Sequence, residues 1–464
     1  MRVSQRLVLL LFVGAVATGV MDARPEEEVF EKRENAAPPR WDWGFQATAI
    51  SQAAPSFRSP YTGPRSFANS GSAAWSTTVT GTVYTGLSLW NGAWVSIQPE
   101  FSGGGGPGGG QGIGAYVNQD AVKAGSSVRQ RPYIARAFLH QELPFGESAQ
   151  EPPASSSEPS RDLDGFVADS NARFGTQKAR RIEITAGKFS MADFFDANDV
   201  AGDVHHRLMN WALVNDGAWD YSADARGYTW GAVLGVFRDS LAFRVAVSAM
   251  PSVANGISFD TALAEAHAEN AEISWAFDPD GKGSVRLLAW ENHARMGSYR
   301  EALASSTSSE RPDITVSRRP GRTKRGLGLN LQRQFGEWGG FLRAGWSDGR
   351  NESFAYTEID RTFSAGAAHG AALIGRPDDT LVLAGVASAL SAEHRQYLEA
   401  GGIGFQVGDG RLRYGREQVI EANYNAQITG GVSLGADFQR VWNPGYNRDR
   451  GPISVFGIRL HLHP

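Results

Sequence analysis

The sequence predicts an all-β fold, namely a 16-stranded antiparallel transmembrane β-barrel with long extracellular loops, one of them folded into the lumen. Segments of about ten residues with one apolar and one polar face recur along the chain, which is typical of barrel strands. Short and long connections alternate between these segments, as they do where tight turns lie on one side of a membrane and long loops on the other. The chain also combines 55 Gly and 11% aromatic residues with a mean hydropathy of -0.31, which favours many alternating strands over one apolar core.

Composition excludes several other classes of protein. The 464 residues include no Cys, which rules out disulfide scaffolds, thiolate metal sites and Cys nucleophiles. The formal net charge of -4 at pH 7 gives no general attraction to nucleic acid. A soluble β-sandwich would give similar alternation, but usually with shorter strands and more even turns.

Residues 1–20 have the pattern of a secretory signal peptide, with cleavage expected between residues 17 and 23. A basic start precedes an uncharged run that ends at Val20 and is too short to span a bilayer as a helix. The charged segment 21–40 follows, which we expect to be a disordered mature N-terminus, and 41–464 is the expected barrel domain. After export, a chain without a spanning helix is either soluble in the periplasm or a closed barrel in the outer membrane. The barrel pattern favours the outer membrane of a Gram-negative cell.

The alternation of apolar and polar residues gives the strand count. Between Leu241 and Ser248, and between Val432 and Gln439, apolar side chains recur at every second position. Sixteen such strands enclose a lumen wide enough for water and solutes. They are expected near 41–51, 74–87, 92–100, 132–142, 181–189, 227–237, 241–248, 268–277, 283–295, 325–335, 338–347, 356–369, 379–390, 417–429, 432–442 and 452–462. Residues 402–407 also have strand character, but an odd strand count is not expected, so we place them in a loop.

The connections fall into two sets. Tight ones such as Asp280-Gly281 and Gly430-Gly431 are typical of hairpin turns. Long ones lie near 52–73, 101–131, 190–226, 249–267, 296–324, 348–355, 391–416 and 443–451. The segment 147–160 falls on the short-turn, periplasmic side and is rich in Glu, Pro and Ser. We expect it to be a mobile insertion rather than a short second domain.

Strand parity also predicts which side chains face the lumen. In 132–142 the set that includes Tyr133 and Leu139 is assigned to lipid, so Arg136 and His140 face inward. By the same test, the side chains that face the lumen include those of Arg181, Glu183, Thr185, Arg244 and Arg343. An Arg facing lipid at mid-membrane costs about 2–4 kcal/mol, which supports the inward placement.

Several stretches of the chain resemble one known protein family. They are Gly187–Phe189, Asp193–Asp196, Asn210–Tyr221, Arg226–Ala232, Ala294–Tyr299, Gly375–Asp379, Asp409–Gly415 and Asn443–Pro452. Together they resemble the carbohydrate-selective porin family typified by OprB. The chain departs from that family in its last residues, His461 to Pro464, where such barrels usually carry an aromatic residue.

The resemblance implies an outer-membrane porin of 16 strands that passes carbohydrates by passive diffusion. Monosaccharides such as glucose, and small oligosaccharides, are the expected solutes, and outer loops are expected to fold inward and narrow the pore. The alternative is a general, non-selective diffusion porin that sorts small hydrophilic solutes by size and charge alone.

The long loop 190–226 is the expected constriction. Asp193–Asn215 is expected to form a helix whose apolar side chains pack into the barrel mouth. Trp211, Trp219 and Tyr221 can then stack on sugar rings, with packing inside the loop as an equal alternative for each. Carboxylates accept and guanidinium groups donate hydrogen bonds, so both suit hydroxyl groups. The candidate residues of the solute path are Arg136, Glu183, Lys188, Asp193, Asp196, Arg207, Trp211, Trp219, Asp220, Tyr221 and Arg226.

The sequence gives no support for catalysis, so a channel and not an enzyme is expected. The G-x-S-x-G match at Gly431–Gly435 lies across a hairpin turn instead of a strand–turn–helix. His461 and His463 can share one strand face, but two His without a third ligand do not predict a zinc site. Neither a cofactor nor a metal ion is therefore expected.

The expected partners follow from the resemblance and from the composition. They are carbohydrate solutes, outer-membrane lipid, lipopolysaccharide and the barrel assembly machinery. Nucleic acid is not an expected partner. The sequence leaves a monomer and a homotrimer open.

Overall fold

The computed structural model describes residues 40–69, 74–123, 131–146, 178–278, 282–306, 310–371 and 375–463. The predicted signal peptide, the charged segment that follows it up to residue 39, and the predicted insertion 147–160 lie outside the described residues.

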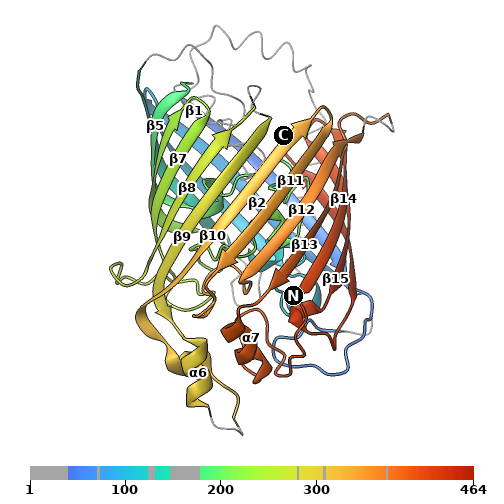
Figure 1. Cartoon of the computed structure of the whole chain (residues 1–464). Helices are drawn as coiled ribbons and strands as arrows, with labels where there is room; N and C mark the ends of the chain where they lie inside the picture. Colours follow the sequence, from blue (N-terminus) through green and yellow to red (C-terminus); the bar gives the residue numbers. More distant parts are fainter. Residues whose placement is uncertain are drawn as a thin grey trace.

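Sixteen strands form one closed ring in which consecutive strands pair and β1 pairs with β16 (Figure 1). The strands are β1 (Trp41–Ala53), β2 (Trp75–Trp90), β3 (Ala93–Gly104), β4 (Tyr133–Pro144), β5 (Arg180–Phe189), β6 (Thr229–Arg238), β7 (Leu241–Ala249), β8 (His267–Ala276), β9 (Gly283–Met296), β10 (Arg319–Phe335), β11 (Trp338–Ser347), β12 (Arg361–Gly370), β13 (Thr380–Ala389), β14 (Glu417–Thr429), β15 (Val432–Trp442) and β16 (Ile453–Leu462). The predicted strand number, order and antiparallel pairing are therefore confirmed. The segment 402–407 is not a strand, as predicted.

Two strands begin several residues away from their predicted starts. β10 begins at Arg319 instead of near 325, because it continues beside β9 through an irregularity between Arg319 and Arg322. β12 begins at Arg361 instead of near 356. The residues before it leave the ladder to bond an inward loop, as when the Thr357 hydroxyl donates to the Gly217 carbonyl at 2.5 Å.

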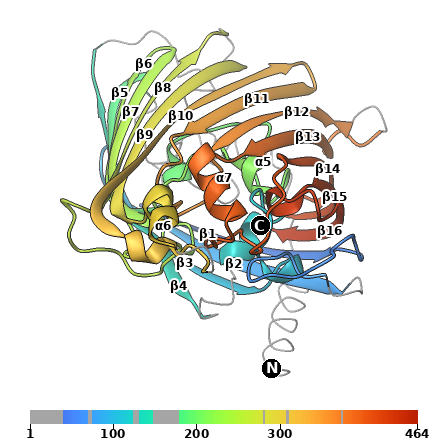
Figure 2. The ribbon, with the colours of Figure 1, turned by 60° about the horizontal axis from the view of Figure 1, so that its bottom comes forward.

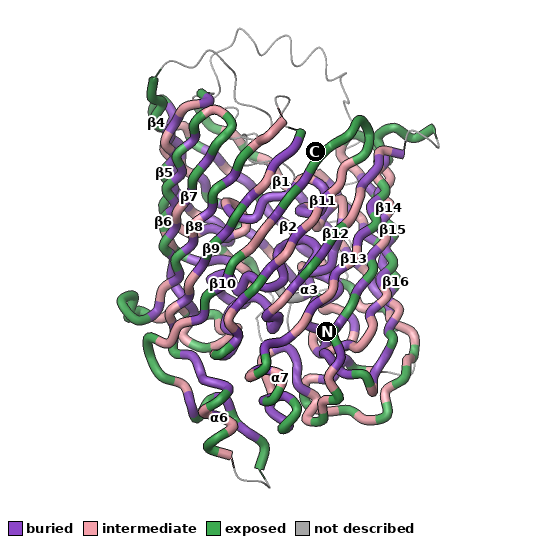
Figure 3. Tube along the Cα trace, viewed as in Figure 1, coloured by how far each residue is buried: buried purple, intermediate pink, exposed green. Residues whose placement is uncertain are grey.

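Buried and exposed residues alternate along the strands of the wall (Figure 3). In β13, Leu381 and Leu383 are exposed, whereas Val382 and Ala384, at the alternate positions, are buried. Exposed apolar side chains of this kind recur around the ring, and exposed Trp residues such as Trp41, Trp230 and Trp338 lie near strand ends. This pattern is typical of a barrel that faces lipid on the outside.

One parity assignment is wrong. The pairing of β3 with β4 shifts between Gln98 and Pro99, a position where Pro cannot donate to the ladder. Tyr133 therefore faces inward, where its hydroxyl donates to Glu100, instead of facing lipid. Arg136 and His140, on the other side of the shift, face inward as predicted and are buried.

The long connections hold the short helices. These are η1 (Pro107–Gly109), α3 (Gln119–Lys123), η3 (Met191–Asp193), α5 (Trp211–Val214), α6 (Tyr299–Ser305), η4 (Ile314–Ser317), α7 (Ala392–Glu399) and η6 (Pro444–Tyr446). Helices α6 and α7 lie at the end of the barrel that carries the long connections, and α5 lies within the outline of the strands (Figure 2). In the described part of the chain, no helix is long and apolar enough to cross a membrane.

The helix predicted over Asp193–Asn215 is wrong, because only the single turns η3 and α5 form there. Side-chain oxygens of Asn198, Asp203 and Asn210 accept backbone N–H groups two or three residues ahead, which turns the chain repeatedly. Asn and Asp compete with helical hydrogen bonds in this way. Asp196 also adopts a positive φ of 56°, which a continuous helix cannot contain.

A charged side chain on the outward face of the wall should destabilise the barrel. We expect Leu383→Arg, in the middle of β13, to lower the free energy of unfolding by about 2–4 kcal/mol, because the guanidinium would face lipid. Leu383 is 57% exposed, and Leu263, at 59%, lies in the β7–β8 connection, so Leu263→Arg is the matched control. Urea unfolding of the protein in lipid bilayers measures both. Equal losses in the two variants would contradict the assignment of this face to lipid.

Candidate functional site

The inward face of the barrel wall carries charged side chains of both signs. Arg136, Arg181, Arg244 and Arg343 are buried on this face, as strand parity predicts. Buried acids on the same face are Glu100, Glu142, Glu183, Glu272, Glu417 and Glu421. Buried charge requires a partner, so these residues need counter-charges or hydrogen bonds from whatever fills the lumen.

Much of that filling is the connection between β5 and β6, residues 190–228, called here the lumen loop. On one side of the ring, Asp196 Oδ1 accepts the Nε–H of Arg343 at 3.0 Å and an Nδ2–H of Asn330 at 2.7 Å. The backbone N–H of Asp196 donates to Glu272 at 2.7 Å. These contacts attach the lumen loop to β8, β10 and β11.

Other strands hold a later part of the same loop. Glu421 of β14 accepts the backbone N–H of Met209 at 2.5 Å and that of Asn210 at 3.1 Å. Arg459 of β16 donates from Nη1 to the carbonyl of Val204 at 2.8 Å and to that of Arg207 at 3.0 Å. Since β14 and β16 are separated from β8 to β11 around the ring, the loop crosses the lumen.

A second inward segment, residues 104–123, follows β3. Glu417 accepts the backbone N–H of Gly114 at 3.1 Å. Gln52 and Gln439 both donate from Nε2 to the carbonyl of Val117, at 3.0 and 2.8 Å. The wall therefore fixes this segment by the same means as the lumen loop.

A third segment, before β12, packs on the lumen loop itself. Asp220 accepts backbone N–H groups of Phe354, Ala355 and Tyr356 at 2.8 to 2.9 Å. The Tyr356 hydroxyl donates to the carbonyl of Trp211 at 3.0 Å. Three segments that are remote in sequence thus form one structure inside the barrel.

Asp216 of the lumen loop sits in a depression made by two glycines of the wall. A Cβ atom on Gly345 would lie 1.9 Å from Asp216 Oδ1, and one on Gly328 would lie 2.8 Å from Oδ2. Asp216 Oδ1 accepts the Ala218 N–H at 2.9 Å and the Thr362 hydroxyl at 2.8 Å. Burial raises the pKa of Asp216 to about 6, and the nearby carboxylate of Asp196 acts in the same direction.

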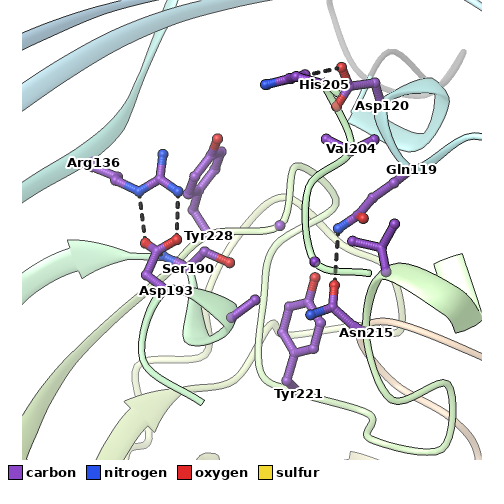
Figure 4. A pocket seen from close by; sticks show the side chains of 14 residues that line it. Gln119, Asp120, Arg136, Ser190, Asp193, Val204, His205, Asn215, Tyr221 and Tyr228 are labelled. Atoms are coloured by element: carbon purple, nitrogen blue, oxygen red, sulfur yellow. Dashed lines mark hydrogen bonds and ion pairs between the residues drawn. The ribbon is translucent and has the colours of Figure 1, made fainter. Parts of the chain in front are cut away.

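A cavity of about 60 Å³, the inner cavity, lies between the lumen loop, α3 and β4 (Figure 4). On one side of it Arg136 pairs with Asp193 through two hydrogen bonds, from Nε to Oδ2 at 2.7 Å and from Nη2 to Oδ1 at 2.6 Å. The Tyr228 ring lies 5.2 Å from this guanidinium. The remaining lining residues are Gln119, Asp120, Ser190, Ala192, Gly202, Val204, His205, Val214, Asn215, Tyr221 and Gly227.

A second cavity of about 40 Å³, the outer cavity, adjoins the first. The two share Gln119, Tyr221 and Gly227. The other residues that line the outer cavity are Trp211, Ala223, Asp224, Ala225, Arg226, Asn255, Ala355 and Tyr356. Asn255 and Ala355, which line the outer cavity, belong to long connections. Val204, which lines the inner cavity, accepts a hydrogen bond from Arg459, near the opposite end of β16. The two cavities therefore follow each other along the barrel axis, away from the long connections.

Three buried polar atoms at these cavities make no hydrogen bond to any described residue. They are Gln119 Oε1, Asn215 Nδ2 and Trp211 Nε1. Gln119 Nε2 donates to Asn215 Oδ1 at 3.3 Å, so each amide uses one of its two polar atoms in this bond. An orphaned buried polar atom costs about 1–3 kcal/mol, so each of the three requires a water or a solute hydroxyl as its partner.

The aromatic side chains of the lumen loop divide into two groups. Trp211 stacks on Tyr356 with ring centroids 5.1 Å apart, and Tyr221 lies 4.3 Å from the same ring. These three rings line the outer cavity. Trp219 is fully buried, donates from Nε1 to Asn270 at 3.0 Å, and lines neither cavity.

The structure brings some of the predicted path residues together and separates others. Arg136, Asp193 and Tyr221 meet at the inner cavity, and Trp211, Tyr221 and Arg226 at the outer one. Outside both linings are Glu183, Lys188, Asp196, Arg207, Trp219 and Asp220.

The predicted residues outside the linings have other contacts. Glu183 accepts the Nε–H of Arg181 at 2.6 Å, and Lys188 donates to the carbonyl of Ile134 at 2.9 Å. Asp196 and Asp220 hold the inward segments in place, as described above. Arg226, which does line the outer cavity, also lies over the Tyr133 ring, 4.1 Å from its centroid.

Sequence reasoning missed several lining residues. Asn215 lies in a stretch that had been singled out for its resemblance, but only the fold aims its amide at the cavity. Gln119 lies in a connection without periodicity, so no sequence signal could have found it. Glu417 and Glu421 line neither cavity but hold the inward segments; they stand at inward positions of β14, where strand parity could have identified them.

Two groups of His and acidic residues have the proximity that metal binding needs. One is His140, Glu142 and Glu183; there Arg181 Nε lies 2.6 Å from Glu183 and 4.0 Å from Glu142, so a guanidinium already occupies a place beside both acids. The other, His206, His461 and His463, contains no carboxylate and is taken up below.

Comparisons with known proteins agree with this architecture. Residues 90–463 match the family model described as carbohydrate-selective porin, OprB family. The structure is similar to the high-pH structure of Pseudomonas putida OprB, with a TM-score of 0.66, 13% identity, and coverage of 94% of this chain and 96% of that chain. It is also similar to the outer membrane channel DcaP of Acinetobacter baumannii, with a TM-score of 0.51, 8% identity, and coverage of 91% and 97%. No curated protein matches the chain in sequence.

The glycine depression under Asp216 should be required for docking of the lumen loop. We expect Gly345→Ala to lower the free energy of unfolding by about 1–3 kcal/mol, because the added methyl group collides with a fixed carboxylate. Gly340→Ala, on the same strand, is the control, since a Cβ there meets nothing closer than 3.9 Å. Urea unfolding gives both values, and equal stability of the two variants would contradict the docking geometry.

Docking of the lumen loop should also depend on pH through Asp216. Its pKa is raised from 3.8 to about 6, so docking favours the protonated acid; this stabilisation is complete below about pH 4 and lost as pH rises through 6. The ratio of docked to undocked loop should fall roughly tenfold between pH 5 and pH 7. The frequency of current fluctuations in single-channel recordings measures it. An unchanged pH dependence in Asp216→Asn, which cannot ionise, would assign the effect to another group.

Proposed function

The chain belongs to the OprB family of carbohydrate-selective porins, and we propose that its sugars cross the lumen through the outer and inner cavities. Family and fold are those of a passive diffusion channel of the outer membrane rather than of an enzyme. The proposed solutes are monosaccharides such as glucose and small oligosaccharides. The same proposal includes export of the chain, directed by its N-terminal signal peptide, in a Gram-negative cell.

The orphaned polar atoms carry this proposal. Gln119 Oε1 is an acceptor, while Asn215 Nδ2 and Trp211 Nε1 are donors, and all three belong to residues that line the cavities. A sugar hydroxyl both donates and accepts, so one kind of group can satisfy all three atoms. A simple ion cannot satisfy donors and an acceptor at the same place.

The charges next to the path favour a neutral solute. Arg136 and Asp193 neutralise each other through two short hydrogen bonds, so this pair presents a dipole instead of a net charge to the inner cavity. Trp211, Tyr221 and Tyr356 give the outer cavity an aromatic wall against which the apolar C–H face of a sugar ring can stack.

The dimensions of the path argue for selection by close contact. Cavities of about 60 and 40 Å³ hold water molecules, but a sugar ring passes only if lining side chains move aside. Every solute would therefore touch these residues. A general diffusion porin, the alternative, would not need such contact.

The barrel surface has its own proposed partners. They are lipopolysaccharide, outer-membrane lipid, the assembly machinery and further copies of the chain in a homotrimer.

The aromatic wall gives the test. In a planar bilayer, glucose should block ion current saturably, and Trp211→Leu should weaken this block by about 0.5–1.5 kcal/mol, or roughly three- to tenfold in affinity. Trp219→Leu is the matched control, because Trp219 lines neither cavity. Block that never saturates would favour the general porin. Equal weakening in both variants would remove the outer cavity from the sugar path.

A further inference from the structure

Three histidines meet inside the barrel toward the end that carries the short turns. His461 and His463 follow each other at alternate positions at the end of β16, and His206 comes from the lumen loop. One ring nitrogen of each lies within 4.8 Å of one ring nitrogen of each of the others. The ring centroids are 4.5 Å apart for His206 and His461, 5.4 Å for His206 and His463, and 5.1 Å for His461 and His463.

The fold brings the third histidine to this place. The period of two in β16 turns His461 and His463 to the same face. Arg459, two residues earlier on that face, donates to the carbonyls of Val204 and Arg207 and so holds the intervening turn against β16. His206 lies in this turn.

The hydrogen bonds of His206 fix which ring nitrogen can bind a metal. Asp203 Oδ1 accepts the backbone N–H groups of His205 at 2.9 Å and His206 at 3.1 Å, which locks the carboxylate in place. Asp203 Oδ2 lies 2.9 Å from His206 Nδ1. A carboxylate only accepts, so Nδ1 carries the proton and Nε2 carries the lone pair. Metal-binding histidines are typically oriented by a carboxylate in this way.

A chain of hydrogen bonds fixes His461 in the same form. Thr82 donates its hydroxyl to Glu100 at 3.1 Å, Gln46 donates from Nε2 to Thr82 at 3.2 Å, and Thr48 donates to Gln46 Oε1 at 2.9 Å. The Thr48 hydroxyl proton is thereby engaged, so its oxygen accepts from His461 Nδ1 at 2.7 Å. The lone pair of His461 is again on Nε2.

We propose that His206, His461 and His463 form a binding site for one divalent transition-metal ion of the zinc class. Imidazole nitrogen suits such ions, and three histidines with a water as fourth ligand make a common tetrahedral site. Zinc–nitrogen bonds of about 2.0–2.1 Å require the nitrogens to approach to roughly 3.4 Å, which side-chain rotation on a loop and at a strand end supplies. The bound ion would tie the lumen loop to β16.

Stacking and hydrogen bonding of the rings alone is the competing explanation. His205 illustrates it, because its ring stacks on His461 at 5.2 Å while its Nε2 lies 3.6 Å from Asp120. Stacking alone requires neither a hydrogen-bond partner on Nδ1 of both His206 and His461 nor a carboxylate behind His206. The ordered second layer around His206 and His461 therefore favours a metal site.

The test uses the full folded chain in detergent, without a polyhistidine tag, stripped with EDTA and titrated with Zn²⁺ by calorimetry. We expect one ion per chain. His206→Gln and His463→Gln should each weaken binding at least about tenfold, and Asp203→Ala about ten- to 100-fold. His267→Gln is the control, because His267 stacks on His293 at 4.4 Å outside this group. All three residues to be changed lie outside the strand ladder, and unchanged heat-modifiable migration verifies folding of each variant.

Two results would overturn the proposal. One is the absence of saturable 1:1 zinc binding to the unmodified chain up to millimolar zinc. The other is equal affinity in the unmodified chain and in folded His206→Gln. A loss that is the same in His267→Gln and His206→Gln would assign the binding to scattered surface histidines and reject this site as well.

Discussion

The backbone polar groups of the segments inside the lumen must find partners, and the closed ring leaves them no strand edge to pair with. Every strand of the barrel is already bonded on both sides. The inward segments are therefore satisfied by side chains that project from the wall, such as Glu417, Glu421 and Arg459. Each of these is an ionisable group that accepts or donates more than one hydrogen bond, which also compensates its own burial. The wall thus functions as a template for irregular chain.

This constraint explains the character of the proposed solute path. Most charges of the wall are used in holding the inward segments, as Arg343 and Glu272 are by Asp196. What remains at the cavities is the Arg136–Asp193 pair, amides and aromatic rings, together with the ionisable residues Asp120, His205, Asp224 and Arg226. A lumen with many ionic groups can in this way present both signs of charge, amides and aromatic rings at these cavities.

The regular part of the structure could be predicted from the sequence, and the irregular part could not. A period of two along the strands gives their number, order and inward residues, because the side chains of a barrel strand face lipid and the lumen in turn. The prediction failed where one local feature decided the outcome. Pro99 shifted a register and moved Tyr133 inward, and Asn198, Asp203 and Asn210 replaced an expected helix by turns.

The candidate site mixes both situations. Arg136 could be placed by parity, whereas Gln119 and Asn215 were brought together only by the packing of two loops. His461 and His463 stood out as a pair in the sequence. Their neighbour His206 could not be found from the sequence, because nothing in it shows which turn of a long loop Arg459 will hold.

The contacts of the lumen loop on both sides of the β1–β16 seam imply an order of assembly. Gln52 of β1 lies 3.9 Å from the Met209 sulfur, and Arg459 of β16 holds Val204, so the loop touches the first and the last strand at once. The loop is synthesised before the second half of the barrel exists. It therefore remains without its final anchor until the last strand arrives and the ring closes. Maturation of the pore interior is then the final event of biogenesis, and a barrel halted before closure would lack a finished channel even though most of its strands had formed.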